Sequence, residues 1–163
     1  MEKDKNIKPG TQRPPLGIGG IASFFGIGYM KGGGSIAAAI CALFWFYLQP
    51  NGIEATWQIL VNIIVLGLGI WSGNVVEKHW GKDSYKVVID EVSGMAITLL
   101  FVPTKWQYIL IGFVLFRFFD ILKPLYIRKM EKLPGGWGVM ADDVLAGIYA
   151  RIILQIVVGC WIV

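Results

Sequence analysis

Residues 58–76 read QILVNIIVLGLGIWSGNVV, an apolar run that contains no charged side chain. A helix of this length is roughly 28 Å long at ~1.5 Å per residue, close to the ~30 Å hydrocarbon core of a bilayer. Trp57 precedes the run, at the position where an interfacial aromatic residue belongs. We therefore expect residues 58–76 to form a transmembrane helix.

The composition of the whole chain agrees with a membrane protein. Of its 163 residues, 55% are hydrophobic and only 16% are charged, which is too apolar for an ordinary soluble domain. The formal charge of +4 is scattered between apolar runs, without the basic stripe that nucleic-acid binding requires. We expect one membrane-embedded domain, residues 16–163, after a polar cytoplasmic tail, residues 1–15, which lacks the features of a secretory signal.

Further apolar runs flank the central one, and polar loops separate them. The predicted spans besides 58–76 are 35–48, 87–102, 106–122 and 142–163, with turn residues at 49–52 and 103–105. The glycine-rich stretch 16–34 favours a re-entrant or interfacial segment, because glycine weakens a regular helix. The sequence thus predicts an all-α integral membrane protein, a compact bundle of four to five transmembrane helices.

The basic residues indicate the orientation of this bundle. Lys and Arg concentrate in the N-terminal region, in loop 77–86 and in stretch 123–132, whereas the two remaining loops contain only Lys105. The positive-inside rule places the basic loops in the cytoplasm. Seven acids then lie at or near the cytoplasmic interface: Glu77, Asp83, Asp90, Glu91, Asp120, Asp142 and Asp143.

Five of these acids lie within or beside apolar runs. They are Asp90, Glu91, Asp120, Asp142 and Asp143. Adjacent carboxylates are costly to bury unless a cation neutralises them. His79 is the only histidine, and ligation by oxygen alone favours Mg²⁺ over Zn²⁺. We expect all five acids to bind Mg²⁺ and to form the catalytic site.

Basic residues accompany these acids. Arg117 and Asp120 share a helix face at spacing i, i+3, and Lys123 continues that face. We expect Arg117, Lys123 and Arg128 to bind a phosphate group. Gly94, four residues after Asp90, would let another helix approach closely.

Other interpretations of these residues remain open at this stage. Asp142 can be the N-cap of the last helix, with Asp143 near its positive dipole end. Arg117 and Asp120 can form a simple intramembrane ion pair, or Arg117 can extend to the interface. A small cation or proton transporter also needs intramembrane acids, although it would place them near the midplane.

Three blocks of the sequence resemble the core motifs of the phosphatidylglycerophosphatase A family. They are KDSYKVVIDEVSGM (82–95), FRFFDILKPLYIR (116–128) and GGWGVMADDVLAGIYA (135–150). The resemblance implies Mg²⁺-dependent removal of the terminal phosphate of phosphatidylglycerophosphate, a membrane phospholipid, in the bacterial inner membrane. It also implies that the five acids form the site, with Arg117 and Lys123 beside them.

One loop departs from the family pattern. Where the family usually has a proline-glycine-threonine turn followed by glycine-serine, this chain has KGGGS at 31–35, of which only Gly34 and Ser35 match. For the reaction we expect hydrolysis in which carboxylate-held Mg²⁺ binds the phosphate and activates water. One acid would act as general base. A covalent aspartyl-phosphate route stays open, although the motif D-x-D-x-T is absent.

Overall fold

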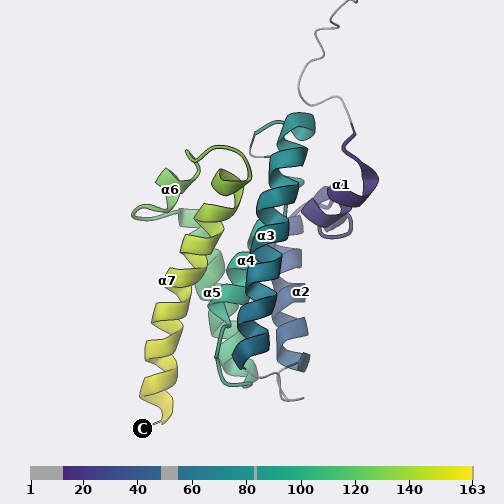
Figure 1. Cartoon of the computed structure of the whole chain (residues 1–163). Helices are drawn as coiled ribbons and strands as arrows, with labels where there is room; N and C mark the ends of the chain where they lie inside the picture. The colour runs from purple at the N-terminus through teal and green to yellow at the C-terminus, as the bar shows by residue number, and fades with distance from the viewer. Residues whose placement is uncertain (1–12, 49–54, 83, 163) are drawn as a thin grey trace, which may run out of the picture.

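The chain folds into helices joined by short loops (Figure 1). The computed structural model describes residues 13–48, 55–82 and 84–162, with side chains to residue 159, and this part contains no strand. The predicted turn at 49–52 and most of the predicted tail lie outside it. The elements are α1 (Leu16–Ala22), η1 (Ile27–Tyr29), α2 (Gly33–Leu48), α3 (Ala55–Trp80), α4 (Ile89–Thr98), α5 (Trp106–Leu122), α6 (Ile127–Met130) and α7 (Gly136–Ile162).

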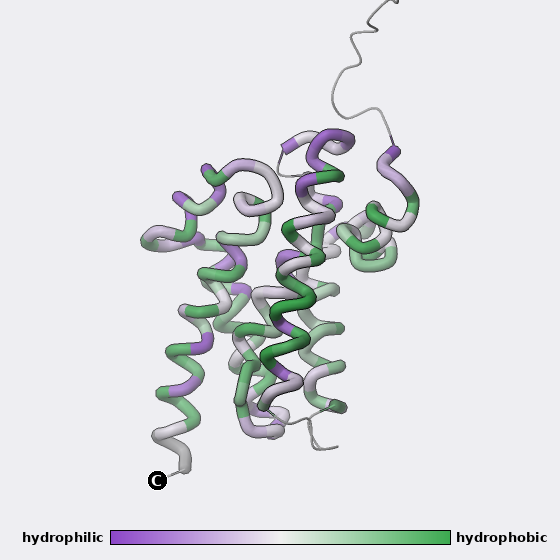
Figure 2. The backbone as a smooth tube through the Cα atoms, in the orientation of Figure 1, coloured by the Kyte–Doolittle hydropathy of each residue, from purple (hydrophilic) through white to green (hydrophobic). Residues whose placement is uncertain are grey.

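Five helices lie alongside one another and alternate in direction. The start of α2, the end of α3, the start of α4, the end of α5 and the start of α7 lie toward one end of the bundle (Figure 1). We call this the α6 end, because α6 lies there as well. Hydrophilic residues gather at the last turns of α3 and around α6 (Figure 2). The alternation agrees with the arrangement predicted from the loop charges.

Helix α3 has the properties of a membrane span. It is the one helix in the described ranges that is long and apolar enough to cross a membrane, judged by length and composition. Little of it is buried inside the bundle, and Ile59, Ile63 and Ile64 are among its exposed apolar side chains. A helix that is apolar around its circumference and largely uncovered suits lipid better than water.

Three predicted helix boundaries were wrong: the end of α4, the end of α3 and the start of α7. Helix α4 ends at Thr98 and has ten residues, so at ~1.5 Å per residue it covers about half of a ~30 Å core. The chain turns there, with Phe101 at positive φ before Pro103. Helix α3 continues to Trp80, which places Glu77 on a helix and outside any loop.

Helix α7 begins at Gly136, well before Asp142, so Asp142 is not an N-cap. The glycine-rich stretch 16–34 forms α1, η1 and the start of α2, and α1 packs against α3. It lies at the side of the bundle near the α6 end (Figure 1). Helix α5 ends at Leu122, as predicted from the following Lys123 and Pro124.

Helices α4 and α7 meet at their backbones. A Cβ on Gly147 would collide with the carbonyl oxygen of Gly94, and a Cβ on Gly94 would meet both the Phe116 ring and the backbone oxygen of Asp143. The Thr98 hydroxyl donates to the Gly94 oxygen over 2.9 Å and lies 3.4 Å from that of Gly147. The close approach predicted at Gly94 is thereby confirmed, and it sets the distance between the two acid-bearing helices.

Gly147→Ala is expected to destabilise the protein by about 1–3 kcal/mol, because the Gly94 carbonyl cannot move without displacing α4. Gly67→Ala on α3 is the matched control, since no atom lies within 4 Å of a Cβ built there. That change is expected to be neutral or slightly stabilising, because alanine favours a helix. Thermal unfolding of both variants in one detergent measures the difference. Equal stabilities would contradict the backbone contact.

Candidate active site

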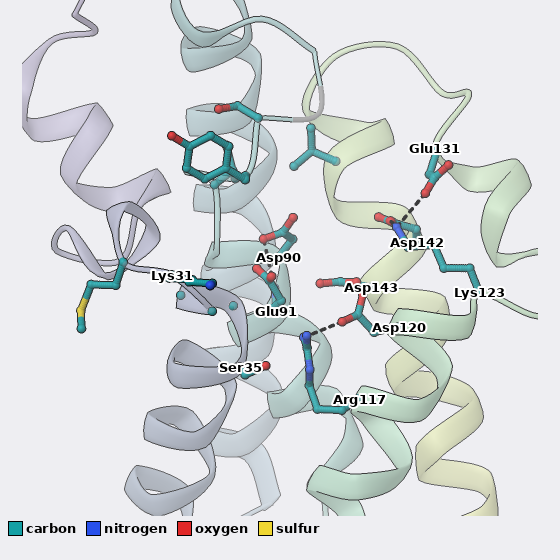
Figure 3. Close-up of a pocket in the computed structure, with 18 of the residues that line it drawn as sticks. Lys31, Ser35, Asp90, Glu91, Arg117, Asp120, Lys123, Glu131, Asp142 and Asp143 are labelled. Atoms are coloured by element: carbon teal, nitrogen blue, oxygen red, sulfur yellow. Dashed lines mark hydrogen bonds and ion pairs between the residues drawn. The ribbon is translucent and has the colours of Figure 1, made fainter.

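A cavity of about 620 Å³ lies near the α6 end, between the start of α2 and helices α4, α5 and α7 (Figure 3). It brings together most of the residues that the sequence singled out. Those lining it are Asp90, Glu91, Arg117, Asp120, Lys123, Asp142 and Asp143. Arg128, the remaining predicted residue, lies on α6 and is exposed outside the cavity lining.

Three of the acids form a tight cluster. Asp90 and Glu91 come from the first turn of α4, and Asp143 reaches them from α7. One carboxylate oxygen of each lies within 4.8 Å of the others. Asp143 is only 3% exposed, and Glu91 Oε2 is buried without a hydrogen-bond partner. These oxygens fit a hard divalent cation such as Mg²⁺, which takes oxygen ligands.

Asp120 is paired with Arg117 on its own helix. The Arg117 Nη1 atom lies 2.5 Å from Asp120 Oδ2, so the ion pair considered from the sequence is present. Asp120 also neighbours Asp143 (Figure 3). The Nε of Arg117 is buried and has no hydrogen-bond partner. Arg117 therefore retains a buried N–H group that can donate a hydrogen bond to an anionic ligand.

Lys123 joins α5 to α7 and to the chain after α6. Its Nζ lies 2.6 Å from Asp142 Oδ2 and 2.7 Å from Glu131 Oε1. Burial alone would lower the pKa of this ammonium, but the hydrogen bonds and attraction of the two carboxylates outweigh burial and hold its pKa above the usual value. Lys123 thus links the end of α5 to α7 and to Glu131 through two ion pairs.

Sequence reasoning missed two parts of the site. Glu131 was passed over inside the basic stretch 123–132, although it is the only acid there. Residues 31–35, expected to be a loop, form the turn before α2 and its first residues; they were singled out only as a departure from a family pattern, yet all of them line the cavity. A Cβ on Gly34 would collide with the Glu91 carboxylate, so a larger residue here would force that carboxylate to shift within the acidic cluster.

The charges lining the cavity do not balance. Six acids line it, the five predicted ones and Glu131, against three cations, Lys31, Arg117 and Lys123. An anionic ligand would be repelled by this excess of negative charge unless further cations were bound. The charge balance therefore points the same way as the oxygen cluster, toward a site for divalent metal.

The structure places a carboxylate-rich cavity with nearby basic groups at one end of an apolar helical bundle, an arrangement that suits a membrane-associated enzyme acting on phosphate. A comparison with known protein families identifies the family to which the chain belongs. The model of the phosphatidylglycerophosphatase A family matches residues 20–158. The chain belongs to this family of phosphatases.

Several curated proteins are similar to the chain. A putative phosphatidylinositol-3-phosphatase of Bacteroides thetaiotaomicron is 41% identical over 88% of this chain and 93% of its own. Phosphatidylglycerophosphatase A of Escherichia coli is 33% identical over 78% of this chain and 75% of its own. The Haemophilus influenzae phosphatidylglycerophosphatase A is 54% identical over 44% and 45%. No solved structure is significantly similar.

Lys123→Gln is expected to cost about 2–4 kcal/mol of stability, because it leaves the buried Asp142 without its counter-charge. The double variant Lys123→Gln/Asp142→Asn should lose less stability than the sum of the losses of its two single variants, because the ion pair is removed only once. Lys132→Gln is the control, because Lys132 is exposed and makes no ion pair within the described residues. Unfolding measurements on the wild type, the two single variants, the double variant and the control test this linkage. Additive losses would contradict it.

Proposed function

We propose that this chain is a Mg²⁺-dependent phosphatase that converts phosphatidylglycerophosphate to phosphatidylglycerol at the cytoplasmic face of the bacterial inner membrane. The observation that carries the proposal is the cluster of Asp90, Glu91 and Asp143, placed beside Arg117 in one cavity. Membership of the phosphatidylglycerophosphatase A family supports the substrate class.

Asp90, Glu91 and Asp143 would hold the metal, with Asp120 next to them. Bound Mg²⁺ would supply charge neutralisation at the phosphate oxygens and a lowered pKa for water. The five-acid ligand set expected from the sequence divides in two here, because Asp120 and Asp142 are each paired with a cation. We assign these two acids to positioning Arg117 and Lys123.

Arg117 would orient the reacting phosphate through its unpaired donor, while Asp120 fixes the guanidinium. A carboxylate lining the cavity would take a proton from the attacking water. Asp142 suits that role in addition to positioning Lys123, because the ion pair uses its Oδ2, whereas its Oδ1 is buried without a hydrogen-bond partner among the described residues. Water oxygen then bonds to phosphorus, the ester P–O bond breaks, and the departing alcohol oxygen gains a proton.

The substrate is expected to be a lipid and not a soluble ester. A cavity at the end of an apolar bundle is reached by molecules whose acyl chains lie in the leaflet, and anchoring positions their phosphate. The names of the relatives include two head groups, glycerophosphate and inositol 3-phosphate. Both lipids carry a phosphomonoester beyond a phosphodiester, which phosphatidic acid does not.

A transporter is the less favoured alternative. A transport site needs access from both sides and acids near the middle of the membrane. Here the acids belong to the first turn of α4 and the early turns of α7, both toward the α6 end (Figure 3). This position suits a reaction at one membrane surface.

Phosphate release in mixed micelles tests the function directly. We expect phosphatidylglycerophosphate to be hydrolysed with a higher kcat/KM than phosphatidic acid, and EDTA to abolish turnover until Mg²⁺ is restored. Phosphatidylinositol 3-phosphate is measured in parallel. A preference for that lipid would reject the head-group assignment, and full activity in EDTA would reject the metal.

The matched variants for this assay are Asp90→Asn, Glu91→Gln and Asp143→Asn. Each should reduce kcat/KM by about 100-fold or more, because it removes a metal ligand. Mg²⁺ should raise the melting temperature of the wild type and not that of these variants, which separates lost metal binding from lost folding. Near-normal rates in two of the three would contradict the assigned cluster.

We also propose that the α6 end faces the cytoplasm, on the strength of its Lys and Arg excess. Cysteine is placed at Lys82 or Lys132 at that end and at Lys105 at the other, after Cys41 and Cys160 are replaced. An impermeant thiol reagent should label the first two only in inverted vesicles and the third only from outside. The reverse pattern would place the site on the external face.

A further inference from the structure

The cations of the cavity differ in what they are paired with. Arg117 is bound to Asp120, and Lys123 is bound to Asp142 and Glu131. Lys31 also lines the cavity, but no ion pair joins it to an acid in the part of the chain that the structure describes. It is therefore a charge available to a ligand, although the sequence had assigned phosphate binding to Arg117, Lys123 and Arg128.

Lys31 lies at the mouth of the cavity. Its side chain is exposed, whereas Asp143 in the acidic cluster is buried. In Figure 3 the side chain extends from the turn before α2 toward the side of the cavity where Asp90 and Glu91 lie. A ligand whose reacting phosphate sits among the acids would bring a more peripheral part of its head group past Lys31.

The loop that carries Lys31 is held in place. The Gly33 amide donates to the Met30 carbonyl over 3.0 Å, and the Ile36 amide donates to the Gly32 carbonyl over 3.1 Å. Gly32 has a φ of +77°, which favours glycine, and Gly34 packs against the Glu91 carboxylate. These contacts fix the approach of the loop to the acidic cluster, so the attachment point of Lys31 is fixed as well.

Ser35 adds a hydroxyl on the same wall. It lines the cavity, and its side chain makes no hydrogen bond within the described residues. An ammonium with no partner and a hydroxyl with no partner, four residues apart on one loop and helix start, form a small polar surface. Charge-assisted hydrogen bonds from such groups are well suited to a phosphate diester.

We propose that Lys31 and Ser35 form a subsite for the second anionic group of the substrate, the phosphodiester that links the head group to diacylglycerol. This inference rests on the proposed function. The subsite selects phospholipids that carry a phosphomonoester beyond a phosphodiester, over phosphatidic acid, which has one phosphate. It serves phosphatidylglycerophosphate and phosphatidylinositol 3-phosphate alike, because both contain the same diester.

The test is the kcat/KM of Lys31→Gln for phosphatidylglycerophosphate and for phosphatidic acid, in mixed micelles at matched surface concentration. Loss of one charge-assisted hydrogen bond corresponds to about a 10- to 100-fold reduction. We expect that loss for phosphatidylglycerophosphate and a change of less than about 3-fold for phosphatidic acid. Lys31→Arg should keep most of the preference, and Ser35→Ala should lose part of it.

Lys82→Gln is the matched control, since Lys82 is exposed near the same end of the bundle and does not line the cavity. It should change neither rate. An equal fall on both lipids with Lys31→Gln would mean that Lys31 binds the reacting phosphate, and unchanged rates would mean that it binds neither; each result overturns the subsite. Wild-type enzyme that releases no phosphate from phosphatidylglycerophosphate would instead reject the proposed function.

Discussion

The contact between α4 and α7 at Gly94 and Gly147 is the constraint on which the site depends. A Cβ on Gly94 would meet the backbone oxygen of Asp143 itself. The absence of that carbon lets the backbone that carries Asp143 approach the first turn of α4, where Asp90 and Glu91 lie. The ring of Phe116, on α5, lies against Gly94 as well. The acidic cluster is therefore a direct consequence of two helices packed without intervening side chains.

Gathering carboxylates in an apolar bundle carries an electrostatic cost, and the structure offsets part of it with fixed cations. Arg117 neutralises Asp120, and Lys123 neutralises Asp142 while also reaching Glu131. In the part of the chain that the structure describes, no ion pair joins Asp90, Glu91 or Asp143 to a cation, and Glu91 Oε2 is buried without a hydrogen-bond partner there. Charge that the protein leaves uncompensated is charge that a bound ion can compensate. This division separates acids that are paired with a cation from acids that are not, within one cavity.

The apolar surface of the bundle and the cavity at its end suit one class of substrate. Exposed isoleucines on α3 suit contact with lipid, and the cavity lies toward the end where the loops carry most of the basic residues. A phospholipid head group would enter from the membrane surface while its acyl chains stay in the leaflet. In the proposed binding mode, residues 31–35 would face the part of the head group that does not react. Under the proposed subsite, exchange of Lys31 would change the preference over phosphatidic acid while the contact between Gly34 and Glu91 stays in place.

Much of this was determined by the sequence itself. Apolar runs and loop charges predicted the helices and their alternating direction, because hydropathy and proline placement act locally. The acids Asp90, Glu91, Asp120, Asp142 and Asp143 were found because buried charge is rare enough to notice in sequence alone. Only the tertiary structure decided that Lys123 pairs with Asp142 and Glu131, that Arg128 lies outside the cavity, and that Lys31 and Glu131 line it. Pairing depends on distances between helices remote in sequence, and those distances are set by glycine contacts between backbones.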